Sequence, residues 1–172
     1  MDMRWAMERV VGHEKLQAAL DRISPAARAE YTHATALSWV SYTTLDEVHE
    51  AVATVAQENP MKLADRIARV TVERSFTTVW RVFLRFTSDE AIVVRTPAFY
   101  AKSRNVGRME TRILSPGTSE SIVSEFPTMP DRDIVILAAS IETVLTLAGR
   151  SDVKTKGERT TEGARFLTRW RI

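Results

Sequence analysis

The sequence contains few residues that could carry out catalysis. Its 172 residues include no cysteine, which excludes a thiolate nucleophile, an iron–sulfur cluster and every zinc site built on cysteine. Only His13, His33 and His49 could serve as an imidazole base. No Gly-x-Ser-x-Gly elbow, Gly-rich phosphate loop or dinucleotide motif is present, because the six glycines are scattered. We therefore expect no catalytic residues and no enzyme activity.

The histidines are not spaced as metal ligands either. No two of them lie at i and i+4 on one helix, and no carboxylate cluster stands near them in sequence. His33 alone could ligate a haem iron, but a lone histidine is far more often solvated or hydrogen-bonded within the protein. Asp131 and Asp133 resemble a carboxylate pair, although a position at a helix N-terminus explains both. The expectation is therefore no metal and no cofactor.

Aromatic residues are the more informative set. They gather in the helical part of the chain, near the point where we expect it to pack on a sheet. A pocket lined by such rings would take a small hydrophobic molecule. Plain core packing is the alternative, and truncating Trp80 or Phe83 should then cost stability before binding. The candidate pocket residues are Trp39, Tyr42, Phe76, Trp80, Phe83, Phe99 and Tyr100.

Charge is nearly balanced, at a formal net +2, but it is unevenly distributed. Residues 1–60 carry a net −4 and residues 61–172 a net +6. A basic bias can attract nucleic acid or an acidic partner, yet the exposed face of a sheet explains it more simply. We expect no nucleic-acid partner and assign the following arginines to an exposed sheet face: Arg108, Arg112, Arg165, Arg169 and Arg171.

The first half of the chain has helical periodicity. The apolar spacing predicts helices over 3–11 and 13–23, and Ser24 with Pro25 predicts a helix start that extends to about residue 31. Residues 32–42 are ambiguous. Thr43 and Thr44 are expected to cap a helix that ends near Asn59. One long helix is expected from Met61 to about Phe86, and another from about Ala91 to Arg104, kinked or broken at Pro97.

After Gly107 the period changes from that of a helix to that of a strand. Residues 107–126 predict a β-hairpin with its turn at Ser115-Pro116-Gly117. Asp131 begins an apolar core helix that ends at Gly149, and two further strands follow over 152–159 and 164–172. The predicted fold class is α+β, with a helical N-terminal half packed on an antiparallel sheet of two β-hairpins separated by a core helix.

No linker, repeat or low-complexity run divides the chain. We expect a single domain over 1–172, with a helical part at 1–106 and a hairpin–helix–hairpin part at 107–172. The chain has no apolar stretch long enough to span a membrane, and charges within its first ten residues argue against a signal peptide. The expected location is the cytoplasm.

Four local patterns support a family resemblance: residues 79–85 (Val-Trp-Arg-Val-Phe-Leu-Arg), 107–110 (Gly-Arg-Met-Glu), Phe126-Pro127, and the tail from Arg159 to Trp170. With the order of elements, they resemble a paralogous family of uncharacterised myxobacterial proteins. That family is similar to vinyl-reductase-type sensory domains, haem-nitric-oxide-binding domains and transport-particle small subunits. The resemblance implies a non-catalytic module for sensing or protein interaction in signalling.

The sequence departs from these relatives at two sites. Where the final hairpin of relatives often has two cysteines and a glycine, this chain has Lys156, Ala164 and Thr160. The haem-binding relatives use a Tyr-x-Ser-x-Arg pattern, and here Tyr100, Ser103 and Arg104 have a different spacing. The resemblance therefore implies neither a thiol site nor a haem site in this chain.

Two functions remain open at this stage. The first is a regulatory or sensory module that binds a small hydrophobic molecule in an aromatic-lined pocket. The alternative is a protein–protein interaction or dimerisation module without a ligand; an enzyme of unrecognised chemistry is a distant third. We also expect a homodimer formed mainly through helices and weakened by salt, since the acidic and basic halves could pair reciprocally across a two-fold axis.

Overall fold

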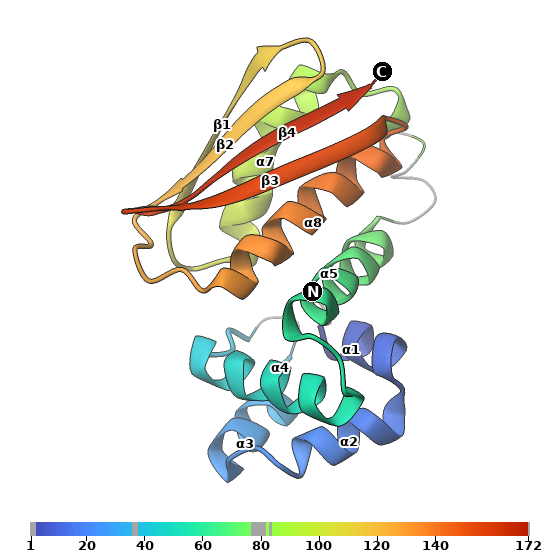
Figure 1. Cartoon of the computed structure of the whole chain (residues 1–172), viewed down its shortest axis with the longest axis vertical. Coiled ribbons are helices and arrows are strands. Elements are labelled where there is room, and N and C mark those ends of the chain that lie inside the picture. The colour runs from blue at the N-terminus through green and yellow to red at the C-terminus, as the bar shows by residue number, and fades with distance from the viewer. Residues whose placement is uncertain (1–2, 36–37, 77–81, 83, 172) are drawn as a thin grey trace. The chain divides into compact units, whose positions relative to one another are not determined.

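The computed structural model describes residues 3–35, 38–76, 82 and 84–171. The chain forms two compact units, which we call unit 1 (residues 1–71) and unit 2 (residues 72–172). Unit 1 is helical, and unit 2 combines helices with a four-stranded antiparallel sheet (Figure 1). The expected α+β class is therefore confirmed. The boundary between the units lies at 71/72, within a helix.

Unit 1 is built from short helices around an apolar core. Tyr31, 5% exposed, donates its hydroxyl to the sulfur of Met7 at 3.1 Å within this core. Leu16, Leu20 and Val52 are fully or almost fully buried beside them. The helices are α1 (Met3–Val11), α2 (His13–Leu20), α3 (Pro25–His33), α4 (Tyr42–Ala56) and the first part of α5 (Pro60–Ser75).

Polar side chains cap the N-termini of two of these helices, α3 and α5. Ser24 caps α3 as expected, with its Oγ accepting from the backbone N–H of Ala27 at 3.3 Å. Asn59 lies at the start of α5, where its Oδ1 accepts from the N–H groups of Met61 and Lys62 at 3.0 and 3.2 Å. Pro60 then occupies the first position of α5, which needs no N–H.

The expected cap of α4 is wrong by two residues. Ser41, rather than Thr43 or Thr44, begins this helix, and its Oγ accepts from the N–H of Thr44 at 3.2 Å. Glu30 explains the difference, since its carboxylate holds the Ser41 N–H at 2.7 Å and also accepts from the Thr44 hydroxyl. A tertiary contact therefore determines which of the three candidates, Ser41, Thr43 and Thr44, caps the helix.

The expected single helix over 61–86 is also wrong. Helix α5 ends at Ser75, and Phe76 lies in a bend. The ring of Phe76 packs edge-to-face against that of Phe99, with centroids 6.2 Å apart, so an aromatic contact competes there with the helical period. Trp80 and Phe83, expected in the core, lie outside the described residues.

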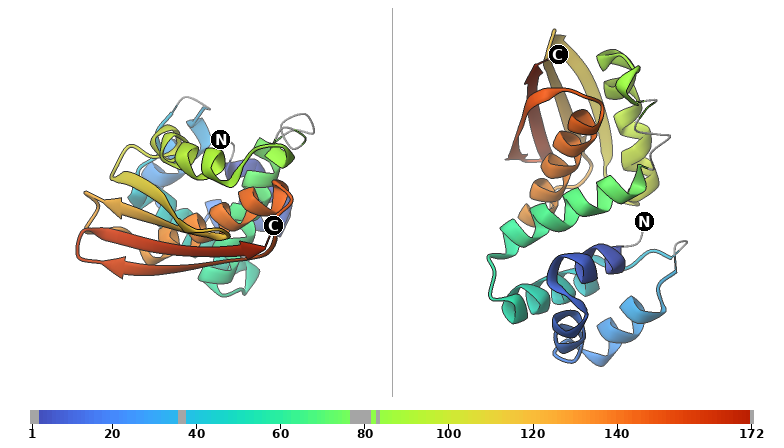
Figure 2. Two further views of the ribbon diagram at one scale, coloured as in Figure 1. Left: turned by 90° about the horizontal axis from the view of Figure 1, so that it is seen from above. Right: turned by 90° about the vertical axis from the view of Figure 1, so that its right-hand side faces the viewer.

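The sheet of unit 2 has the strand order β1-β2-β4-β3 and is antiparallel throughout. Two helices lie on one side of it, α7 against β1 and α8 against β3, as both views of Figure 2 show. The two hairpins are β1–β2 and β3–β4, and α8 separates them in sequence, as expected. The elements are α7 (Asp89–Ser103), β1 (Arg108–Ser115), β2 (Thr118–Ser124), α8 (Asp131–Leu147), β3 (Ser151–Thr160) and β4 (Gly163–Arg171).

The core of unit 2 lies between the sheet and its two helices. Phe166 is fully buried on β4, directly opposite Gly157 of β3. A Cβ at Gly157 would lie 2.6 Å from Ile134 of α8 and 3.0 Å from the Phe166 ring, so only glycine allows α8 this close to the sheet. Trp170, Leu145 and Ile92 continue the core toward the other end.

No helix in the described part of the chain is long and apolar enough to cross a membrane.

Replacing Phe166 with alanine should destabilise the protein by about 3–5 kcal/mol, because it leaves a cavity in the centre of unit 2. Thermal unfolding followed by circular dichroism should show a melting temperature at least roughly 6 °C lower. Phe86→Ala is the matched control, since the Phe86 side chain is 86% exposed. Equal melting temperatures for the two variants would contradict this account of the core.

Candidate functional site

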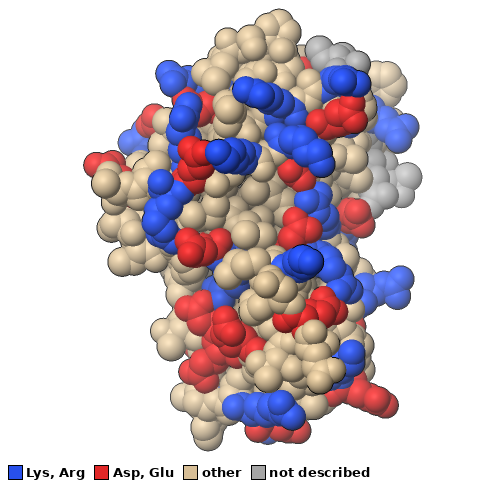
Figure 3. Space-filling view, viewed as in Figure 1, with Lys and Arg blue, Asp and Glu red and all other residues tan. Residues whose placement is uncertain are grey.

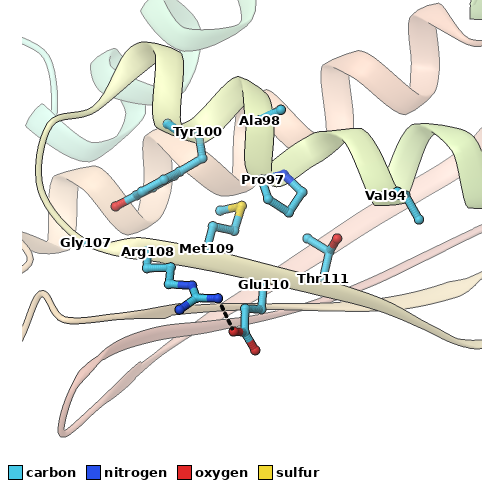
Figure 4. Close-up of a pocket in the computed structure, with 10 residues that line it drawn as sticks. Val94, Pro97, Ala98, Tyr100, Gly107, Arg108, Met109, Glu110 and Thr111 are labelled. Carbon is cyan, nitrogen blue, oxygen red and sulfur yellow. Dashed lines mark ion pairs between the residues drawn. The ribbon is translucent and has the colours of Figure 1, made fainter.

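A groove of ≈ 660 Å³ runs between α7 and β1 in unit 2. In Figure 4, Met109 and Thr111 of β1 are directed toward the helix, while Arg108 and Glu110 are directed to the other side of the strand. The lining is mostly apolar, with helix residues at i, i+3, i+4 and i+7 supplying one wall. The lining residues are Val94, Pro97, Ala98, Tyr100, Ala101, Gly107, Arg108, Met109, Glu110 and Thr111.

Pro97 determines how α7 meets β1. A proline inside a helix has no N–H, so the carbonyl four residues earlier, that of Val93, loses its helical donor. The hydroxyl of Thr111 on β1 donates to this carbonyl at 2.6 Å. The helix therefore continues through Pro97. The Val93 carbonyl, which the proline leaves without a helical donor, accepts from the strand instead.

Tyr100 closes one end of the groove. Its ring is buried, and its hydroxyl donates to the backbone carbonyl of Val106 at 2.8 Å. Gly107 follows with a φ of 78°, and a Cβ there would lie 2.8 Å from the tyrosine oxygen. The tight turn into β1 thus requires glycine and keeps the phenol in place.

The aromatic candidates from the sequence occupy different places. Tyr100 lines the groove, whereas Phe99, 54% exposed, does not line it and packs against Phe76. Trp39 and Tyr42 belong to unit 1, and the Trp39 side chain is 55% exposed. The proposed aromatic lining of a pocket therefore stays a prediction, with Tyr100 at the groove.

Two buried ion-pair clusters were not identified from the sequence. Asp133, expected only as a helix-start residue, is 2% exposed, and its Oδ2 accepts from Arg104 at 2.9 Å. Asp89 accepts from Arg150 at 2.7 Å and from the Trp170 indole N–H at 2.9 Å. Both clusters join residues far apart in the chain, so no local sequence pattern predicts them.

A second, smaller hollow of ≈ 370 Å³ includes Asp89 and Arg150 among its lining residues. Arg150 also donates to the Thr87 carbonyl at 2.7 Å, so its guanidinium holds α7 to the end of α8. These contacts give the cluster a structural role. Among the described residues, no group of histidines, aspartates and glutamates is arranged to hold a metal ion.

The face of the sheet opposite α7 and α8 carries charged side chains. Figure 3, seen from the same side as Figure 1, shows Lys and Arg side chains over the strands with carboxylates between them. The side chains of Arg108, Arg112, Arg165 and Arg171 are 67%, 69%, 48% and 80% exposed, and Arg169 is also exposed. All five side chains are therefore exposed on the strands, and their assignment as a functional basic face stays a prediction.

Glu120 is a buried carboxylate that pairs with two arginines of this face. Its side chain is 3% exposed and lies between Arg165, whose Nε is 2.6 Å from Oε1, and Arg112, whose Nε is 2.7 Å from Oε2. The hydrogen bond from Arg165 is the largest influence and lowers the pKa of Glu120 below its ordinary value. Burial opposes this effect, and Arg112 adds to it. Two exposed arginines therefore serve to neutralise one buried carboxylate.

No family model and no curated protein matches the sequence. Solved structures do match its fold. The Fe(II) unliganded H-NOX protein from K. algicida has a TM-score of 0.73 at 8% identity, over 99% of this chain and 94% of that one. An H-NOX domain related to soluble guanylate cyclases, in its oxygen complex, has a TM-score of 0.69 at 9% identity, over 98% and 90%.

A third similar structure concerns haem redox potential modulated through protein-induced porphyrin distortion (TM-score 0.70, 9% identity, 99% of this chain and 96% of that one). At these identities the likeness shows the fold alone. It confirms the haem-nitric-oxide-binding part of the expected resemblance at that level, and the other relatives stay predictions.

The residues of this chain do not fit a haem in the groove. Haem iron is commonly held by histidine, cysteine, methionine or tyrosine. Unit 2 contains neither histidine nor cysteine, and the hydroxyl of its one tyrosine, Tyr100, donates to Val106. Met109 lines the groove, but methionine ligates haem iron together with a histidine, which unit 2 lacks. Arg104, a cation of the kind that pairs with a haem propionate, is held by Asp133. In unit 1, His13 Nδ1 lies 3.0 Å from Glu8, His33 is exposed at the end of α3, and His49 is 3% exposed in the core.

Thr111→Val should lower the free energy of unfolding by about 1–3 kcal/mol, because the Val93 carbonyl loses its donor beside Pro97. Thermal unfolding measures this loss. The double variant Pro97→Ala/Thr111→Val should recover part of it, since alanine restores the helical N–H to Val93. A double variant no more stable than Thr111→Val would contradict the compensating role of Thr111.

Arg165→Gln should lower stability at pH 7 by about 1 kcal/mol, because Glu120 loses its main hydrogen-bond donor. A carboxyl with a lowered pKa contributes stability above its ordinary pKa, and this contribution is lost as the pH falls through the folded-state value. The difference from the unsubstituted protein should therefore narrow as the pH falls below the ordinary range of a glutamate, in melts recorded between neutral and acidic pH. Arg169→Gln, on the same strand and face, should show little pH-dependent difference.

Proposed function

We propose that this chain is a non-catalytic regulatory or sensory module that binds a small hydrophobic molecule in the groove between α7 and β1. The observation that carries this proposal is the groove itself. Its ≈ 660 Å³ lies within the roughly 300–1,000 Å³ common for small-molecule sites. Val94, Pro97, Ala98, Ala101 and Met109 give it an apolar lining.

The polar groups of the groove favour an uncharged ligand. The hydroxyls of Tyr100 and Thr111 donate to backbone carbonyls of the protein, so neither is a ready donor to a ligand. Arg108 and Glu110 pair with each other at 3.4 Å on the rim. A charged ligand would lose its hydration without gaining a matched partner, whereas an apolar ligand gains from burial.

The fold likeness supports a sensory role. One structural neighbour is an oxygen-binding H-NOX domain, so the same fold holds a small ligand in that protein. For this chain we propose a role of the same class with a different site, because its residues do not fit a haem in the groove. Catalysis has no support in either unit, since the candidate bases are three scattered histidines.

Ligand binding is best tested by native mass spectrometry of the purified protein together with titration by the apolar dye Nile red. A retained small molecule, or saturable dye binding, is expected for the unsubstituted chain. Ala98→Trp should fill the groove and weaken dye binding by about tenfold or more, which corresponds to roughly 1.4 kcal/mol. Ala29→Trp, at an exposed site on α3, is the matched control and should bind normally.

Two results would count against this function. A Soret band with stoichiometric haem would show that the chain binds the cofactor despite its lack of suitable ligands in the groove. Absence of both a retained molecule and saturable dye binding would favour the alternative, a protein-interaction module without a ligand.

A further inference from the structure

One row of side chains crosses three strands on the exposed face of the sheet. Arg169 of β4 lies opposite Thr118 of β2 on one side and opposite Lys154 of β3 on the other. Residues directly opposite each other in neighbouring strands direct their side chains to the same face, with Cβ atoms about 5 Å apart. Arg169 and Lys154 are exposed, and Thr118 is half-buried. We call these three residues the donor row, because their guanidinium, ammonium and hydroxyl groups all donate hydrogen bonds.

The other cations of this face already have carboxylate partners within the protein. A cation in such a pair is matched by the protein itself and needs no ligand. The pairs are Arg108 with Glu110, Arg112 and Arg165 with Glu120, Arg171 with Asp152, and Lys156 with Glu158.

The donor row has no such partners. Neither Arg169 nor Lys154 forms an ion pair with any residue that the structure describes, and the Thr118 hydroxyl has no hydrogen-bond partner among those residues. Like charges directly opposite each other destabilise a sheet. The pairing of Arg169 with Lys154 therefore costs stability in the free protein, and an anion bound between the two cations would remove that cost.

A phosphate monoester matches the donor row in charge and in shape. It carries a charge of about −1.5 to −2 at neutral pH and three acceptor oxygens. A carboxylate carries a single charge and two oxygens in one plane, so it would neutralise only one of the two cations. The guanidinium of Arg169 can donate two parallel N–H groups to a phosphate. Because β4 lies between β2 and β3, a phosphate held by Arg169 has Lys154 on one side and Thr118 on the other.

We propose that the donor row binds the phosphate of a phosphorylated serine or threonine in a partner protein. Arg169 is the central binding residue, Lys154 supplies the second positive charge, and Thr118 donates a hydrogen bond from its hydroxyl. Leu167, two residues before Arg169 on the same face and only partly buried, offers an apolar contact to a neighbouring side chain of the partner. The site lies on the opposite side of the sheet from α7, so it does not depend on the proposed function of the groove.

A phosphorylated protein segment fits this surface better than a free metabolite or a membrane. Neither of the two hollows described above includes a residue of the donor row, so a small phosphorylated metabolite would leave most of its surface in water. The side chains of Asp152 and Glu158, 64% and 50% exposed, lie on either side of the row, where they pair with Arg171 and Lys156. An anionic bilayer would bring negative charge close to both carboxylates, whereas a single phosphorylated side chain reaches the row alone.

Phosphate recognition is tested with a short capped peptide, Ala-Ala-phosphoserine-Ala-Ala, titrated into the isotope-labelled chain and followed by NMR. Saturable shifts of the backbone amide signals of Thr118, Lys154 and Arg169 are expected. Peptides with serine or glutamate in place of phosphoserine should bind at least about tenfold more weakly, because they lack the dianion. Equal affinity of the glutamate and phosphoserine peptides, or the absence of a saturable shift, would overturn the proposal.

Substitutions identify the binding residues. Arg169→Gln should weaken phosphopeptide binding by at least about tenfold, because it removes the paired N–H donors and one charge. Arg159→Gln is the matched control, since it removes one positive charge from β3 at a residue that pairs with Asp131 at 2.5 Å. This control should bind the peptide normally. Unchanged binding by Arg169→Gln, or an equal loss in Arg159→Gln, would contradict the assigned site.

Charge reversal separates a binding role from a structural one. Lys154→Glu places opposite charges across the two strands, so it should raise the melting temperature by roughly 1–4 °C while abolishing phosphopeptide binding. A lower melting temperature would mean that the two cations stabilise the sheet together, and would count against a row kept for a ligand.

Sedimentation with vesicles made of equal parts phosphatidylcholine and phosphatidic acid tests a membrane as the source of the phosphate monoester. We expect no binding to these vesicles. Vesicle binding that is lost in Arg169→Gln, without binding of the phosphopeptide, would assign the row to a membrane and refute the proposal. Nile red binding should be unchanged in Arg169→Gln, so failure of this proposal and failure of the groove's proposed function are distinguishable.

Discussion

The contact between the Thr111 hydroxyl and the Val93 carbonyl is the interaction on which the junction of α7 and β1 in unit 2 depends. Pro97 deprives that carbonyl of its helical donor, and an unsatisfied carbonyl in a partly buried position would cost about 1–3 kcal/mol. Because β1 supplies the replacement donor, the defect in the helix becomes the point at which helix and strand are joined. The groove follows from this junction, since Pro97 and Thr111 both line it.

Buried and partly buried carboxylates determine the position of several arginines in unit 2. Asp89, Glu120 and Asp133 are each held by arginine, and Asp89 also accepts from the indole of Trp170. An ionised carboxylate removed from water requires such partners, so the arginines are needed by the fold itself. These arginines therefore have a structural role, although each ion pair is neutral and does not explain the net positive charge of the second part of the chain.

The elements of the fold were largely predictable because their signals are local. The alternation after Gly107, the Pro116-Gly117 turn and the uncharged face of α8 each lie within a few residues, and all correspond to observed elements. The start of α4 and the end of α5 were not predictable in this way. They depend on Glu30 and on the Phe76–Phe99 contact, which join separate segments.

The site was less predictable than the fold for the same reason. Thr111 and Val93 are 18 residues apart, Arg104 and Asp133 are 29 apart, and Trp170 and Asp89 are 81 apart. Sequence reasoning proposed Tyr100 as one of several pocket candidates from its aromatic character. The apolar stripe of Val94, Pro97, Ala98 and Ala101 has no signature that separates it from an ordinary buried helix face. Only the position of β1 shows that this stripe borders a groove.

The chain shares its fold with H-NOX structures over nearly its whole length at identities below 10%, and a shared fold does not by itself determine the ligand. A haem requires an axial ligand at one place, and here the second unit has no imidazole or thiolate to offer. The position of α7 on the sheet does not depend on a haem. The helix is held by protein contacts of Thr111, Tyr100 and the Arg150–Asp89 pair. With those contacts internal to the protein, the scaffold can keep its shape without a haem, and the surface between α7 and β1 is left for the different class of molecule that we propose.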